Sequence, residues 1–182
     1  AIEINAGDSL PLAQVGKPYP LFAFTAVDSY SLVAKTDVTV SHLGETVAVE
    51  EEAFVPFEVG SYVITYTAVD AFGNKAEESV TVEARNSLPP LTLQIEEFSL
   101  HPVVGERITL PRATAEGGSG RAEVAATVRS MNTGEELPVE NNRLVCEEAG
   151  DYLLIYTAVD YIGDTVTEYV YIYDVSEEQC IV

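Results

Sequence analysis

The fold is decided by a stretch that occurs twice in this chain. It runs Gly60-Ser-Tyr-Val-Ile-Thr-Tyr-Thr-Ala-Val-Asp70 and returns as Gly150-Asp-Tyr-Leu-Leu-Ile-Tyr-Thr-Ala-Val-Asp160. Seven of the eleven positions are identical, at a spacing of 90 residues. Both copies are rich in β-branched and aromatic residues, as is typical of a β-strand, in which successive side chains point to opposite faces. The chain is therefore a tandem repeat whose unit contains this strand.

Each copy continues through a short turn into a second extended run, and this pattern predicts a β-hairpin. Each turn contains a glycine, Gly73 or Gly163. Tight hairpin turns need a residue with a positive φ, and glycine adopts a positive φ at little cost. Asp70 and Asp160 stand immediately before the turns. We expect their carboxylates to accept hydrogen bonds from the N–H groups of the turn, as in an Asx-turn.

The residues that begin the hairpin are typical of the tyrosine corner of immunoglobulin-type sandwiches. Tyr62 and Tyr152 take the corner position, two residues after Gly60 and Gly150. An aliphatic residue follows where antibody domains have a cysteine, and the chain has no Trp. The sequence predicts an all-β fold made of two tandem immunoglobulin-like antiparallel β-sandwiches, without the usual core disulfide and tryptophan.

The hairpin pattern resembles that of bacterial Ig-like and hyalin-type repeat modules. The shared pattern is Gly-x-Tyr-x-aliphatic-x-Tyr-Thr-Ala-Val-Asp-x-x-Gly-Asn/Asp, matched over residues 60–84 and 150–174. The second copy has Asp164 where Asn is usual in these modules. They occur in tandem in secreted and cell-wall-attached proteins, where they act as spacers, adhesive units or accessories to enzymes. The resemblance implies an extracellular β-sandwich and implies no catalytic activity.

The repeat also predicts the domain boundaries. Residues 1–84 and 91–174 form the two sandwiches, and residues 85–90 form a short linker with two prolines. Residues 175–182 lie beyond the repeat, as a tail or the start of another linker. The chain begins with Ala, and no segment has the ~20 apolar residues of a membrane span. We expect a mature piece of a longer secreted or cell-surface protein.

The charge is strongly acidic along the whole chain. Nine basic and thirty acidic residues give a net charge of −21. Such a field disfavours nucleic acid and anionic lipid as partners. Flanking domains of the same protein, and a cell-surface glycan or protein, remain as candidate partners.

Little in the sequence indicates catalysis. His42 and His101 are the only histidines, and neither has a Cys or His at metal-ligand spacing. We expect both to be surface residues. There is no glycine-rich phosphate loop and no GxSxG motif. The sequence predicts no catalytic residue, no metal and no cofactor.

Two features leave alternatives open. Cys146 and Cys180 either form a disulfide or are one buried and one terminal cysteine. Asp160 and Asp164, four residues apart on a turn, either cap the turn or contribute to a calcium site.

One difference between the repeats indicates a candidate surface. If strand residues of the second hairpin alternate as in the first, its outward face is apolar and tyrosine-rich, where the first repeat has Ser79, Thr81 and Glu83. Another part of the chain or a flanking domain covers this face, or it binds a ligand. The outward residues are Leu153, Ile155, Tyr169, Tyr171 and Tyr173.

These observations favour a non-catalytic structural or interaction module, a spacer or adhesion unit, in a secreted or surface-attached bacterial protein. The alternative is a glycan- or protein-binding module that uses the tyrosine face. An enzyme is the third hypothesis, because it needs converging polar side chains in a pocket, and the sequence gives no sign of them.

Overall fold

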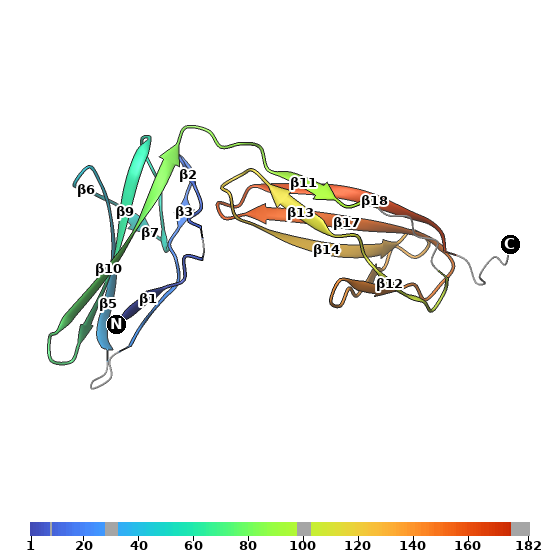
Figure 1. Ribbon diagram of the computed structural model, residues 1–182, viewed down its shortest axis with the longest axis horizontal. Coiled ribbons are helices and arrows are strands. Elements are labelled where there is room, and N and C mark those ends of the chain that lie inside the picture. The colour runs from blue at the N-terminus through green and yellow to red at the C-terminus, as the bar shows by residue number, and fades with distance from the viewer. Residues whose placement is uncertain (8, 28–32, 98–102, 176–182) are drawn as a thin grey trace. The chain divides into compact units, whose positions relative to one another are not determined.

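The computed structural model describes residues 1–7, 9–27, 33–97 and 103–175. Every regular element in these ranges is a β-strand (Figure 1). The contacts divide the chain into two compact units. Unit 1 comprises residues 1–90 with 117–121 and 161–163, and unit 2 comprises the rest of the described chain from Leu91 onward. No helix in the described ranges has the length and apolar character needed to cross a bilayer.

Unit 1 contains a five-stranded sheet in the order β2-β10-β9-β5-β6, a three-stranded sheet in the order β3-β8-β7, and the pair β1-β4. All pairings are antiparallel except the short parallel pairing of β10 with β2. The strands are β1 (Ile2–Ile4), β2 (Ala13–Gln14), β3 (Tyr19–Pro20), β4 (Phe24–Ala26), β5 (Val33–His42), β6 (Glu45–Val47), β7 (Val49–Glu50), β8 (Ala53–Phe54), β9 (Gly60–Asp70) and β10 (Lys75–Arg85).

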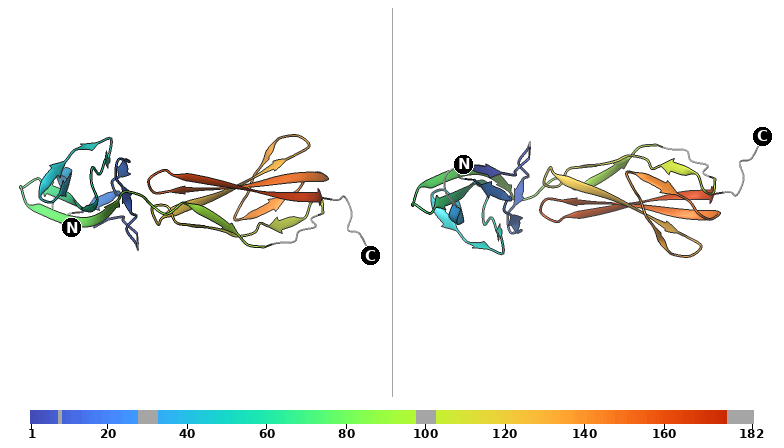
Figure 2. Two further views of the ribbon diagram at one scale, coloured as in Figure 1. Left: turned by 90° about the horizontal axis from the view of Figure 1, so that it is seen from above. Right: turned by 90° about the horizontal axis from the view of Figure 1, so that it is seen from below.

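Unit 2 contains a four-stranded sheet in the order β15-β14-β17-β18 and the pairs β11-β13 and β12-β16. The long hairpin of β17 and β18 lies at one side of this sheet, as Figure 2 shows from two further directions. The strands are β11 (Thr92–Ile95), β12 (Arg107–Thr109), β13 (Ala113–Glu116), β14 (Ala122–Ser130), β15 (Glu136–Leu137), β16 (Arg143–Val145), β17 (Gly150–Asp160) and β18 (Thr165–Val175).

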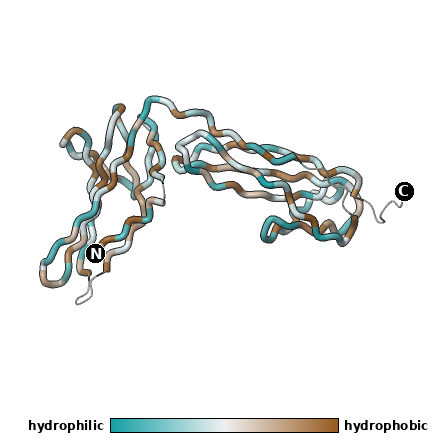
Figure 3. Tube along the Cα trace, viewed as in Figure 1, coloured by the Kyte–Doolittle hydropathy of each residue, from teal (hydrophilic) through white to brown (hydrophobic). Residues whose placement is uncertain are grey.

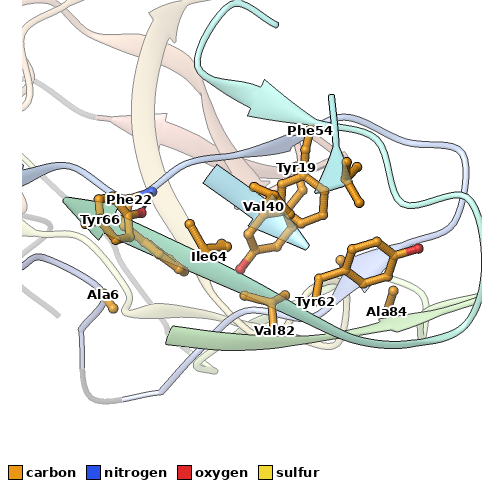
Figure 4. Close-up of a cluster of buried hydrophobic side chains, with 12 residues drawn as sticks. Ala6, Tyr19, Phe22, Val40, Phe54, Tyr62, Ile64, Tyr66, Val82 and Ala84 are labelled. Carbon is orange, nitrogen blue, oxygen red and sulfur yellow. Dashed lines mark hydrogen bonds between the residues drawn. The ribbon is translucent and has the colours of Figure 1, made fainter. Parts of the chain in front are cut away.

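Side chains from both layers meet in one core in each unit. In unit 1, Tyr62, Ile64 and Tyr66 of β9 are fully buried (Figure 4). Tyr19 and Phe54 come from the three-stranded sheet, and the Phe54 ring lies 5.4 Å from the Tyr62 ring. Apolar and polar residues alternate along the strands (Figure 3). Each unit is thus an immunoglobulin-like β-sandwich, which confirms the predicted fold class.

The tyrosine at the start of each long hairpin has its ring in the core and its hydroxyl against the backbone. The Tyr62 hydroxyl donates to the carbonyl of Glu58 at 3.0 Å and accepts from the N–H groups of Phe57 and Glu58 at 3.0 and 3.1 Å. In unit 2, the Tyr152 hydroxyl donates to the carbonyl of Glu148 at 2.6 Å. These bonds satisfy backbone groups of the segment that leads into β9 or β17.

The glycine before each corner tyrosine makes room for a polar side chain. Gly60 has φ +140°, and a Cβ there would lie 2.9 Å from His42 Cε1. Gly150 has φ +138°, and a Cβ there would lie 2.2 Å from Asn132 Nδ2. His42 and Asn132 are themselves 90 residues apart, so the repeat includes this contact.

The hairpin between β7 and β8 has an unusual turn. Glu51 and Glu52 form its two central positions with φ 49° and 60°, the geometry of a type I′ turn. Unit 2 has Asn141 and Asn142 at the same positions, with φ 51° and 61°. Asn tolerates this region, whereas Glu carries the steric cost of a longer L side chain.

We expect Tyr62→Phe to lower the free energy of unfolding of unit 1 by about 1–3 kcal/mol, because partly buried backbone groups lose their partner. Tyr171→Phe, which removes an exposed hydroxyl, is the control and should change stability by less than about 0.5 kcal/mol. Calorimetry of the full chain measures both. Equal transitions for Tyr62→Phe and the wild type would contradict the structural role of this hydroxyl.

Replacing the strained turn by that of unit 2, with Glu51→Asn/Glu52→Asn, should stabilise unit 1 by about 1–2 kcal/mol through relief of the left-handed strain. The reverse change in unit 2, Asn141→Glu/Asn142→Glu, should destabilise that unit by a similar amount. Urea unfolding of the wild type and of these two double variants measures both changes. A loss of stability in the first variant would show that the glutamates make contacts worth more than the strain.

Candidate functional site

Three tyrosines stand in a row on the outward face of strand β18. Tyr169, Tyr171 and Tyr173 are 58, 48 and 59% exposed, respectively. Their intervening neighbour Ile172 is buried at 2%, as expected from the two-residue period of a strand. The rings of Tyr171 and Tyr173 lie 5.7 Å apart between centroids and are nearly parallel, with 12° between their planes. Within the described sheet, β18 is an edge strand, so the row lies along a margin.

Apolar residues of β17 extend this row into a wider face. Ile155 is the cross-strand partner of Tyr169, and Leu153 is the partner of Tyr171. Both side chains are half-buried. Residues at directly opposed positions on one side of a sheet lie close enough for their side chains to touch. The structure thus brings all five residues of the predicted face together, and we call them the tyrosine face.

Strand β14 continues the two rows of opposed residues that contain Ile155 and Leu153, and these rows carry little net charge. On β14, Thr127 is opposite Ile155, and Arg129 is opposite Leu153. The Arg129 guanidinium donates to the Glu136 carboxylate at 3.0 Å, so this pair is close to neutral as seen from the face. These two rows are thus close to neutral in a chain of net charge −21, and the acid of this side of β17 is Asp151, two residues before Leu153.

The equivalent face of unit 1 is polar. Its strand β10 places Ser79, Thr81 and Glu83 where unit 2 has the three tyrosines. Here Thr65 and Ser79 share a hydroxyl hydrogen bond of 2.9 Å, and Ser61 donates to Glu83 at 2.5 Å. The polar side chains of this face therefore bond to one another across β9 and β10. The two units thus share a hairpin but not its outward chemistry.

The hairpin turns are held by their aspartates. Asp70 Oδ1 accepts from the N–H groups of Phe72 and Asn74 at 2.8 Å each, and the Asn74 side chain donates to Asp70 Oδ2 at 2.7 Å. Gly73 follows with φ +87°. These bonds have the geometry of an Asx-turn.

Unit 2 repeats this turn in simpler form. The Asp164 N–H donates to Asp160 Oδ1 at 2.8 Å, and Gly163 again has φ +87°. Among the described residues there is no group of three or more His, Cys, Asp or Glu that could hold a metal ion. Nothing here supports the calcium alternative for Asp160 and Asp164.

His42 is not the surface residue that the sequence suggested. It is 3% exposed, and its ring stacks on Tyr62 with 4.4 Å between centroids and 19° between planes. Its Nδ1 lies 2.9 Å from the Ser61 carbonyl and its Nε2 2.9 Å from Glu58 Oε1. The cause is the missing side chain of Gly60, which leaves room for the ring over the corner. His101 lies outside the described residues.

Of the two cysteines, Cys146 lies in the described part of the chain. Cys146 is fully buried in the core of unit 2 and forms no disulfide with another described residue. Cys180, like the rest of residues 176–182, lies outside the described residues, so the disulfide and the pair of separate cysteines both stay predictions.

The raised pKa values in unit 2 arise from core burial. Burial raises the pKa of the Cys146 thiol to about 11 and that of the Tyr156 hydroxyl to about 12. The Tyr156 hydroxyl donates to the carbonyl of Pro111. A perturbed pKa in a cleft would suggest catalytic chemistry, but these groups are packed among core side chains.

Sequence reasoning missed one further surface, a groove in unit 1 between β6 and the β7–β8 hairpin. No periodic pattern marks it. The signal that could have found it is the pair Glu51-Glu52 at positions where the second repeat has Asn141-Asn142.

Comparison with known proteins finds similar solved structures and no match in sequence. No family model matches the chain, and no curated protein matches it in sequence. Among solved structures, it is similar to the fibronectin(III)-like modules of Clostridium thermocellum CbhA, with 16% identity, coverage of 97% of this chain and 95% of that chain, and a TM-score of 0.46.

A second similar structure is SGBP-B of the Bacteroides ovatus mixed-linkage glucan utilization locus, in complex with a mixed-linkage heptasaccharide. Identity is 14%, coverage is 94% of this chain and 47% of that chain, and the TM-score is 0.27. Both scores are too low to support an inference about function, which therefore rests on the chain's own residues.

The buried acids of unit 2 predict a loss of stability at alkaline pH. In the unfolded chain Cys146 and Tyr156 lose their protons near their ordinary pKa values of 9.0 and 10.0. Above these values the folded state binds more protons than the unfolded state, so the free energy of unfolding falls as pH rises toward about 11 and 12. Their contribution is fully present below pH 9.

Urea unfolding of unit 2 between pH 8 and 11 measures this decline. In Cys146→Ala the decline should begin about one pH unit higher, because only the buried tyrosines Tyr152 and Tyr156, whose pKa values burial also raises, remain to be ionised. A stability that stays constant from pH 8 to 11 would contradict the burial of these groups.

Proposed function

We propose that the chain is a non-catalytic adhesion module of a secreted or surface-attached protein, with residues 1–84 and 91–174 as two repeat domains. The tyrosine face of the second repeat is its contact surface. The observation that carries the proposal is the exposure of Tyr169, Tyr171 and Tyr173 at 58, 48 and 59% beside half-buried aliphatic residues. The resemblance of the hairpin to bacterial tandem modules supports the extracellular setting.

A contact role follows from the cost of leaving this face bare. Contiguous apolar surface in contact with water is unfavourable and usually marks an interaction site. Tyrosine is suited to contacts because its ring offers apolar area and its hydroxyl a hydrogen-bonding group, at the entropic cost of few rotatable bonds. A spacer needs no such surface, and unit 1 has none at the equivalent strand positions.

The chemistry of the face favours an uncharged glycan as partner. A sugar ring has an apolar C–H face that stacks on an aromatic ring, and hydroxyl groups that bond to tyrosine hydroxyls. The rows that contain Leu153 and Ile155, with Arg129 paired to Glu136, offer no attraction to an acidic or a basic polymer. A long row along an edge strand suits a linear chain better than a single sugar.

The test compares the wild type with Tyr169→Ser/Tyr171→Thr, which introduces the residues of unit 1. We expect the wild type to be retarded on one or more neutral polysaccharides in affinity electrophoresis, and the double variant to lose at least about tenfold in affinity. Ser79→Ala/Thr81→Ala, at the same positions of unit 1, is the control and should bind like the wild type.

Two results would contradict the proposal. Retention that survives in the folded double variant would place the site elsewhere. A wild type that binds none of the glycans on a broad neutral array would overturn the glycan as partner, and a protein partner would then be the remaining use of the face.

A further inference from the structure

A groove in unit 1 is lined by residues of β6, of the β7–β8 hairpin and of the segment that follows it. Its volume is about 680 Å³, within the range of ligand-binding clefts. Val47 and Phe54 form a buried apolar floor, while Val55 and Phe57 line it with 47 and 56% of their surface exposed. Glu50 and Glu51 also line it, and both are exposed.

The backbone around the groove has open hydrogen-bonding edges. Strand β6 is the last strand of the five-stranded sheet, and β7 is the last strand of the three-stranded sheet. Residue Ala48, which lines the groove, joins the two. An edge strand presents unpaired N–H and C=O groups, to which an extended peptide can add as a further strand.

The same location in unit 2 has changed its chemistry. A smaller groove of about 340 Å³ lies there. It has Glu147 in place of Phe57, Arg143 in place of Ala53, and Asn141 in place of Glu51. The groove of unit 2 keeps Glu140 at the position of Glu50, but Arg107 and Arg143 balance its two glutamates, so a net acidic and apolar groove is a property of unit 1.

We propose that this groove binds an extended, basic segment of a partner protein, in which Lys or Arg alternates with Val, Ile or Phe. Alternate side chains of such a segment point to opposite sides, so one set enters the apolar floor. Charge complementarity selects the other set. Glu50 and Glu51 make no ion pair with any other described residue, and the chain's net charge of −21 attracts a basic segment.

The strained turn fits this assignment. Glu51 and Glu52 hold left-handed backbone positions at a cost that Asn at the same place in unit 2 does not carry. A purely structural turn would favour Asn or Gly there. The Glu51 carboxylate brings charge to the rim instead, and Glu51→Asn/Glu52→Asn is expected to stabilise the fold while weakening the binding.

The test uses a fluorescein-labelled peptide, Lys-Val-Lys-Phe-Lys-Val-Lys, and the full chain, with anisotropy as readout. We expect this peptide to bind at least about tenfold more tightly than Lys-Ser-Lys-Ser-Lys-Ser-Lys or Glu-Val-Glu-Phe-Glu-Val-Glu. Phe57→Glu, which introduces the residue of unit 2, should weaken binding at least about tenfold. Phe72→Glu is the matched control, because Phe72 is 81% exposed in the β9–β10 turn and outside the groove.

The Phe57 ring contacts His42 and Tyr62, so its variant must be shown to keep the wild-type thermal transition. If it does not, Val55→Glu replaces it. Hydrogen exchange locates the peptide, since addition to the edge should protect the amides of residues 46–48. The binding should be unchanged in Tyr169→Ser/Tyr171→Thr, so the groove and the tyrosine face succeed or fail separately.

Three outcomes would overturn the proposal. Equal binding of the Lys-Ser peptide would reduce the effect to the net charge of the chain. Full binding by folded Phe57→Glu and Val55→Glu variants would place the peptide elsewhere. A lack of binding at millimolar peptide would leave the groove without its proposed occupant.

Discussion

The hydroxyl of the corner tyrosine is the constraint on which each unit depends. A ring as deeply buried as Tyr62 can place its polar end only where backbone groups need a partner, and the segment before β9 supplies them. That arrangement makes the chain turn sharply, with Gly60 at a positive φ. The open space over the glycine is then filled by His42, whose ring nitrogens bond to Ser61 and Glu58. One buried hydroxyl thus determines the conformation of a whole corner.

Outside this shared frame, buried positions exchange one apolar side chain for another, as Phe54 for Leu144, whereas exposed positions change in chemical character. Buried positions must keep volume and hydrogen bonds, because a mismatch there costs several kcal/mol, whereas most exposed positions change at little cost. Tyr171 in the second repeat is equivalent to Thr81 in the first. Phe57 in the first repeat is equivalent to Glu147 in the second. Both proposed surfaces arise from such exposed differences. The repeat supplies two similar scaffolds that carry unlike surfaces.

The sequence was informative where structure is local and repeated. The strands of the hairpin and the outward side of Tyr169 follow from a period of two residues, which needs no knowledge of distant contacts. His42 could not be placed this way, because its burial depends on a glycine 18 residues later and on acceptors from another strand. The groove was hidden for a similar reason, since it is formed by β6, the β7–β8 hairpin and Pro18 rather than by one periodic segment.

Charge separates the two surfaces by the partners that they can accept. A net charge of −21 repels acidic polymers from every part of the chain, at distances up to about the Debye length of 8 Å at physiological salt. A neutral glycan is unaffected by this field, so its binding to the tyrosine face depends on stacking and should persist at high salt. A basic segment is attracted by the field and by Glu50 and Glu51, so its binding must weaken as salt rises. The response to salt therefore tells which surface a given partner uses, even before any residue is changed.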